Sequence, residues 1–187
     1  MLYGSRADGS ATPDSDYDVA AFAPIERTLR DARLLEGAFL DVFIYPEAQM
    51  SDATEEFLKL RQGKVVLQRN TDADEFLTKL EELFHRGPQP LPPDEIEARR
   101  VWALKMSARS QRGDVEGNYR RVWLLYALLE DYFMTRGMWY QGPKKALQWL
   151  RAFDEDAFGR FSAALAPGAS QEFIHTLAQF VARGRDA

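Results

Sequence analysis

The sequence predicts an α+β chain in which a small mixed-sheet domain is followed by an all-α helical bundle. Strand-like and helix-like segments alternate before residue 87. A short stretch, 87–93, then carries four prolines, and from Asp94 onward only helical periodicity remains. Prolines in that density cannot propagate a helix and favour an extended spacer. The predicted organisation is therefore a catalytic-type domain at 1–86, a linker at 87–93 and a helical domain at 94–187.

Apolar runs place the strands of the first domain. Aromatic and branched residues predict strands at 1–3, 18–22, 38–45 and 64–68, and Pro46 closes the richest of these runs. Between them, Leu29, Ala32 and Leu35 recur at helical spacing among charged residues. That spacing predicts a helix over 25–35, and similar patterns predict short helices at 54–60 and 74–84.

The second domain shows helical spacing throughout. Helices are predicted at 95–112, 118–136, 143–153, 154–165 and 170–183, with Asp94 as an N-cap and Pro143 in a first turn. One set of aromatic side chains is expected to form mainly the bundle core: Trp123, Tyr126, Tyr132, Phe133, Trp139 and Tyr140. Some of these could instead stack on a base or an acceptor ring.

Composition excludes several classes of function. The chain has no cysteine, so thiolate metal sites and cysteine nucleophiles are excluded. No stretch of 18 apolar residues predicts a membrane span, no signal peptide is visible, and a cytoplasmic protein is expected. The net charge of −5 argues against general nucleic-acid binding, and residues 1–93 hold 17 acidic and 10 basic residues.

One polar constellation lies within the first 45 residues. The first strand stops at Gly4 and Ser5, a polar loop follows, and Asp16 and Asp18 lead into the second strand. Gly4 lets the backbone approach a phosphate closely, and Ser5 offers a hydroxyl and an N–H to a phosphate oxygen. Carboxylates two apart on a strand share a face and repel one another unless a cation intervenes. Asp41 lies inside an otherwise apolar strand, where an unpaired carboxylate would be costly.

This string resembles the signature of the nucleotidyltransferase superfamily related to DNA polymerase β. The matching parts are the hydrophobic residue before Gly4-Ser5, the ten-residue spacer, Asp16-x-Asp18 between hydrophobics, and the later Asp41 within a strand. The spacer is similar to that of minimal prokaryotic members, and the resemblance covers residues 1–69.

The resemblance implies a set of roles. Gly4 and Ser5 would contact the β- and γ-phosphates of a nucleoside triphosphate, expected to be ATP. Asp16 and Asp18 would bind two Mg²⁺ ions, and Asp41 would help hold the second ion and assist deprotonation of an acceptor hydroxyl. Members of the superfamily usually have a helix before the first strand, whereas this chain starts at the strand itself, so one face of the sheet is expected to be exposed and activity could be impaired.

Three functions compete at this stage. The leading hypothesis is transfer of AMP from ATP to a hydroxyl acceptor, which could be a small molecule such as an aminoglycoside. In that case the helical domain would select the acceptor, because the arrangement resembles aminoglycoside nucleotidyltransferases. The alternatives are an antitoxin-like protein adenylyltransferase and a catalytically inactive nucleotide-binding module, and a homodimer is possible. Glu130 could act as an acceptor-side base, and Lys144 and Lys145 could meet the triphosphate, although solvated roles suit all three.

Overall fold

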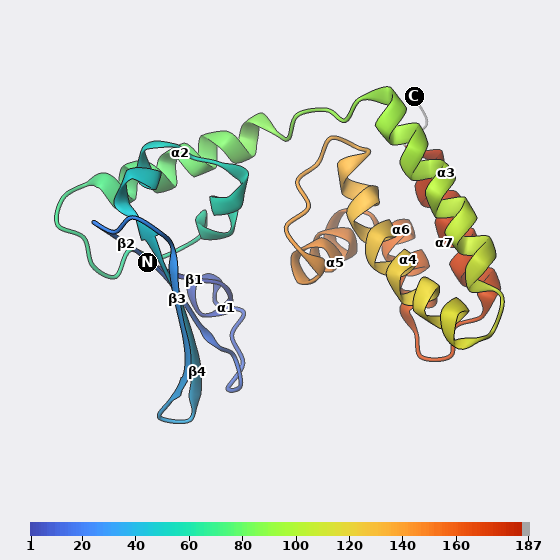
Figure 1. Ribbon diagram of the computed structural model, residues 1–187, viewed down its shortest axis with the longest axis horizontal. Helices are drawn as coiled ribbons and strands as arrows, with labels where there is room; N and C mark the ends of the chain where they lie inside the picture. Colours follow the sequence, from blue (N-terminus) through green and yellow to red (C-terminus); the bar gives the residue numbers. More distant parts are fainter. Residues whose placement is uncertain (185–187) are drawn as a thin grey trace. The chain divides into compact units, whose positions relative to one another are not determined.

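The computed structural model describes residues 1–184, and the chain divides into two compact units, Met1–Arg86 and Gly87–Ala187. The first unit contains a mixed sheet and the second contains helices only, so the predicted α+β class is confirmed. Figure 1 shows the sheet strands in blue and the helices of the second unit in green to red.

The sheet of the first unit has four strands in the order β1-β2-β4-β3. These are β1 (Leu2–Tyr3), β2 (Tyr17–Ala23), β3 (Leu29–Leu35) and β4 (Ala38–Pro46). The central strands β2 and β4 run parallel, whereas β1 pairs antiparallel with β2 and β3 pairs antiparallel with β4. The two central strands therefore hold one register along their whole paired length, with Asp18 opposite Asp41.

The helix predicted over 25–35 is wrong, because that segment contains the edge strand β3. Its residues pair with β4 from Leu29 opposite Ile44 to Leu35 opposite Ala38. The spacing of Leu29, Ala32 and Leu35 favours a helix only locally. Pairing with β4, whose residues strongly favour a strand, overrides this local preference.

The turn between β3 and β4 explains how the strand forms. Glu36 and Gly37 are the two residues between the strands, with φ of 52° and 85°. Positive φ at both central residues is the backbone of a tight hairpin whose twist matches the flanking strands. Figure 1 shows the resulting long hairpin.

Helical segments cover one face of the sheet. They are the 3₁₀ turns η1 (Glu47–Ser51) and η2 (Glu55–Leu60) and the helix α2 (Asp72–Arg86). Their apolar side chains and one sheet face form a single core of Tyr3, Ala20, Tyr45, Phe57, Leu60, Phe76 and Leu80. On the opposite face Val19, Val42 and Ile44 are only partly buried.

The strand predicted at 64–68 is also wrong. Only Lys64 bridges the sheet, through two hydrogen bonds with the backbone of Leu2 at 2.9 and 2.8 Å. Val66 and Leu67 are largely exposed. The apolar residues of this segment therefore predicted a strand that the structure does not contain.

The second unit is a helical bundle. Its helices are α3 (Pro93–Ser110), α4 (Val115–Met134), α5 (Pro143–Phe153), α6 (Glu155–Leu165) and α7 (Gln171–Arg183). Each predicted helix is present, with ends shifted by a few residues, and α3 begins at Pro93 without a side-chain cap. No helix within residues 1–184 is long and apolar enough to cross a bilayer.

The aromatic residues of the bundle divide into two groups. Tyr132 and Phe133 are buried in the core, as expected. Trp123 and Tyr126, however, remain 48% and 59% exposed on α4. The predicted core assignment therefore holds for only part of this set.

Candidate functional site

Gly4 stands at the junction between β1 and the single helical turn α1 (Ser5–Asp8). Its φ is 69°, and its carbonyl accepts hydrogen bonds from the amides of Ala7 and Asp8 at 3.0 and 3.1 Å. A Cβ placed on Gly4 would lie 2.3 Å from Oδ2 of Asp18. The absence of a side chain at position 4 is thus what lets the Asp18 carboxylate lie against this backbone.

The loop between α1 and β2 is tied down by Arg6. Its guanidinium donates to the carbonyl of Ser15 from Nε at 2.9 Å and Nη2 at 2.5 Å, and it lies over the Tyr17 ring at 3.9 Å. The amide of Thr12 also donates to Oγ of Ser15 at 2.9 Å. Arg6 therefore orders the loop that delivers Asp16 and Asp18.

The sheet brings two of the predicted carboxylates together. Asp18 and Asp41 are paired residues on adjacent parallel strands, so their side chains leave the same face. Asp16 precedes β2 in the loop and is exposed. Within the described part of the chain no group of three or more acidic or histidine side chains is placed to hold a metal ion.

Asp41 has a protein partner that the sequence did not reveal. Arg30 donates from Nε to Oδ1 and from Nη2 to Oδ2, both at 2.8 Å, so both carboxylate oxygens are engaged. The hydrogen bonds from Arg30 hold the pKa of Asp41 below its ordinary value, against the opposing effect of burial, and the charges of Arg30 and Lys59 act in the same direction. The carboxylate that seemed unpaired in the sequence is therefore compensated across the β3–β4 hairpin.

Two further residues surround these carboxylates. Tyr3 is opposite Asp18 in the β1–β2 pairing, and its pKa is raised chiefly by burial and then by the nearby charge of Asp18. The Lys59 ammonium lies 4.7 Å from the Phe43 ring centroid and 5.9 Å from that of Tyr3. Tyr3 was visible only as a strand residue, and nothing in the sequence placed Arg30 or Lys59 beside Asp41, because that requires the hairpin register and the position of η2.

The side chains of this site include oxygen donors of the kind that bind divalent cations. Asp18 and Asp41 offer oxygen ligands from one sheet face, and carboxylates are the ligands Mg²⁺ prefers. Asp16 directly precedes β2, two residues before Asp18. A second ion that used Asp41 would have to take oxygens that Arg30 holds. These carboxylates are of the kind that suits a divalent cation, but within the described residues they do not form a three-ligand site, and a cation at Asp41 would first have to displace Arg30.

The charged residues singled out in the helical unit are partly buried or exposed. Glu130 is partly buried on α4, and Lys144 is exposed in the first turn of α5. Lys145 donates to Oε1 of Gln141 at 3.5 Å. His85 and His175 each bond local groups: Nδ1 of His85 lies 2.8 Å from the carbonyl of Glu81, and Nδ1 of His175 lies 3.1 Å from Oγ of Ser107.

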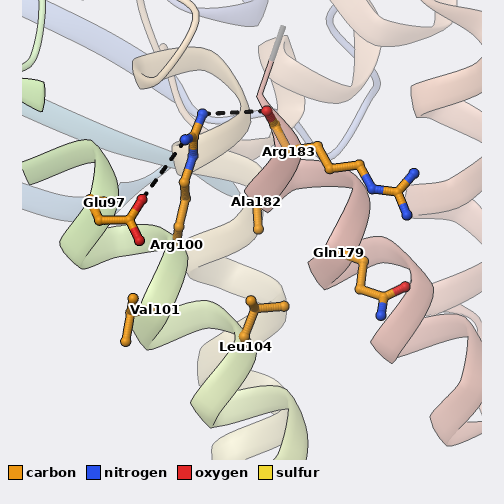
Figure 2. Close-up of a pocket in the computed structure, with 7 residues that line it drawn as sticks. All are labelled: Glu97, Arg100, Val101, Leu104, Gln179, Ala182 and Arg183. Carbon is orange, nitrogen blue, oxygen red and sulfur yellow. Dashed lines mark hydrogen bonds and ion pairs between the residues drawn. The ribbon is translucent and has the colours of Figure 1, made fainter. Parts of the chain in front are cut away.

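A groove lies between α3 and α7 of the helical unit. Figure 2 shows Arg100 reaching from α3 toward Glu97 and the carbonyl of Arg183, with Val101 and Leu104 below it. The groove measures about 310 Å³ and is lined by Glu97, Arg100, Val101, Leu104, Gln179, Ala182 and Arg183. None of the predicted site residues lines it.

No protein-family model and no curated protein matches this chain. In structure it is similar to a nucleotidyltransferase-like protein from Exiguobacterium sibiricum 255-15, with a TM-score of 0.42 and 13% sequence identity. The match covers 88% of this chain and 60% of that protein, so the chain spans about three fifths of the length of the protein it matches.

Proposed function

We propose that the first unit is a divalent-cation-dependent nucleotidyltransferase that moves a nucleoside monophosphate, AMP from ATP in the first instance, to a hydroxyl acceptor. The observation that carries this proposal is the position of Asp18. Its carboxylate lies against the side-chain-free backbone of Gly4 and beside the paired Asp41. A phosphate-accessible backbone next to two carboxylates suits a nucleotide that is bound with a cation.

Each residue has a proposed role in that reaction. Gly4 and Ser5 would contact phosphate oxygens, while Asp16 and Asp18 would hold the cation, which would neutralise charge on the transferring phosphoryl group. The acceptor oxygen bonds to the α-phosphorus, the bond from that phosphorus to the bridging oxygen breaks, and pyrophosphate leaves. The acceptor proton needs a base. We propose Asp41 as this base, although its lowered pKa makes it a weak base while Arg30 holds it.

The acceptor is proposed to bind through the helical unit. A small cationic molecule with hydroxyl groups, such as an aminoglycoside, suits the negative charge of residues 1–93, which hold 17 acidic and 10 basic residues. Glu130 is the carboxylate of α4 that we would examine first on the acceptor side.

Pyrophosphate release tests this function. The full chain is incubated with labelled ATP, Mg²⁺ and a panel of acceptors, including aminoglycosides and proteins. Release that requires an acceptor, and falls by at least about a hundredfold in Asp18→Asn, is the expected result. The matched control is Asp31→Asn, because Asp31 lies in the same sheet on the opposite face, opposite Val42. Equal loss in both variants, or no release with any acceptor, would contradict the proposal.

A second candidate is a module that binds the nucleotide without turnover. The bidentate hydrogen bonding of Arg30 to Asp41 favours this second candidate, because the guanidinium satisfies both carboxylate oxygens without any metal. This candidate predicts binding of ATP that Asp18→Asn weakens, with no pyrophosphate released under any condition.

A further inference from the structure

Arg30 and Asp41 form a contact in the candidate site that a cation bound at Asp41 would have to change. Both oxygens of Asp41 accept from the guanidinium at 2.8 Å. The Asp41 side chain is only 15% exposed, whereas that of Arg30 is 57% exposed. The carboxylate is therefore fixed in the sheet, and the arginine is the partner that can move.

Little else retains Arg30. Within residues 1–184 its other interactions are with the Phe43 ring, whose centroid lies 5.0 Å from the guanidinium carbon, and an electrostatic one with Tyr3. Its strand, β3, is at the edge of the sheet and pairs only with β4. A guanidinium in this position can swing away from Asp41 without breaking any backbone pairing.

A divalent cation at Asp41 competes with Arg30 for the same oxygens. The two positive charges would also repel each other at short range. A triphosphate removes this conflict, because phosphate oxygens accept the planar guanidinium fork as well as a carboxylate does. The charged or titratable groups that face this region are Asp18, Asp41, Tyr3, Tyr45, Arg30 and Lys59. Only Arg30 and Lys59 are cations, which is too little positive charge to balance a triphosphate without a metal ion.

We propose that Arg30 is a positioning residue that exchanges partners, holding Asp41 in the nucleotide-free protein and passing to the phosphates of the incoming nucleoside triphosphate when a divalent cation takes Asp41. This inference rests on the proposed function and goes beyond it. Cation and triphosphate would bind cooperatively through Arg30, and the coupling would act equally in both directions.

The test uses two binding measurements on the full chain and its Arg30→Gln variant. Mn²⁺ affinity without nucleotide is measured by the spin-resonance signal of free Mn²⁺. Affinity for a non-hydrolysable ATP analogue is measured by calorimetry in saturating Mg²⁺. We expect Arg30→Gln to bind Mn²⁺ about tenfold more tightly and the analogue about tenfold more weakly. A purely structural role would move both affinities in the same direction.

Matched variants make the outcome decisive. Arg33→Gln is the control, because Arg33 lies on the same strand, pairs with Asp31 at 3.4 Å and is opposite Leu40 on the other face. It should leave both affinities unchanged. Arg30→Lys keeps the charge without the fork and should give intermediate values, which also covers the case of a Gln variant that folds poorly.

Two kinds of failure are distinguishable. If the unaltered chain binds Mn²⁺ and the analogue but Arg30→Gln changes neither affinity, or both in one direction, partner exchange is overturned while the proposed function stands. If the unaltered chain binds neither ligand, the proposed function fails and the exchange fails with it.

Discussion

The carboxylate of Asp18 occupies the space that a side chain on Gly4 would fill, since a Cβ on Gly4 would lie 2.3 Å from Oδ2. Gly4 also has a φ of 69°, which L-residues rarely adopt. Two separate constraints therefore require glycine at this position. One is the backbone conformation, and the other is the space that the Asp18 carboxylate occupies.

Replacing Gly4 with alanine should separate these constraints. We expect Gly4→Ala to lower the free energy of unfolding by about 1–2 kcal/mol and to turn Asp18 away from its position, which would abolish cation binding. Chemical denaturation and Mn²⁺ binding measure the two effects. Gly9→Ala is the control, because Gly9 has a φ of 84° with no atom near its Cβ position. It should lose about 1 kcal/mol and keep its cation affinity. Unchanged Mn²⁺ affinity in Gly4→Ala would refute the steric argument.

Arg6 should contribute order to the loop rather than charge to a ligand. Removing its two hydrogen bonds to Ser15 and its contact with Tyr17 in Arg6→Ala should cost about 1 kcal/mol of stability and make residues 9–16 more sensitive to proteolysis. Limited proteolysis with mass spectrometry reads this out. Arg27→Ala, at an exposed position outside the loop, should leave the digestion pattern unchanged. A loop that stays protected in Arg6→Ala would contradict this role.

The helical unit contains an ion pair between a partly exposed arginine and a buried aspartate, and the cost of losing it should depend on pH. Arg99 donates to Oδ1 of Asp131 at 2.7 Å, and the Asp131 side chain is 7% exposed. Arg99→Ala leaves that carboxylate buried without its cation, so we expect a loss of about 3 kcal/mol at neutral pH. Arg112→Ala, which breaks exposed pairs with Asp114 and Glu116, should cost less than about 1 kcal/mol.

The sign of the pH effect follows from the pKa of Asp131. Burial raises that pKa, while the hydrogen bond and charge of Arg99 lower it, so Arg99→Ala should raise it further. A carboxyl with a raised folded-state pKa binds more protons folded than unfolded, so stability falls as pH rises from the ordinary aspartate value, about 4, through the raised value. The Arg99→Ala penalty should therefore shrink in acid. Urea denaturation across this range measures it, and an equal penalty at every pH would contradict the assignment.

The β3–β4 turn should tolerate only certain residues. Gly37→Ala puts a side chain at φ 85° and should cost about 1 kcal/mol. Glu36 has φ 52°, where asparagine is better accommodated, so Glu36→Asn should be neutral or slightly stabilising. Thermal denaturation distinguishes the two. If Gly37→Ala were as stable as the unaltered chain, the turn assignment would fail.

Local residue patterns were sufficient for the α+β class, for the strands that contain Asp18 and Asp41, and for each helix of the second unit. Those elements follow from spacing and from runs of apolar residues that one short segment contains. The segments 25–35 and 64–68 were predicted wrongly because their conformation depends on whether they pair with a strand elsewhere in the chain. Leu29–Leu35 is a strand because β4 pairs with it, whereas 64–68 has strand-like composition but only Lys64 finds a partner in the sheet.

The candidate site divides in the same way. The sequence by itself determined that Gly4, Ser5, Asp16, Asp18 and Asp41 are present in a telling order, because covalent order and residue chemistry are properties of the chain. Only the tertiary structure decided that Asp18 and Asp41 are neighbours, that Asp16 stands in the exposed loop, and that Arg30 holds Asp41. The physical reason is that strand register and the hairpin turn determine which of these side chains meet. Both depend on pairing between separate segments, whereas a sequence pattern describes each segment by itself.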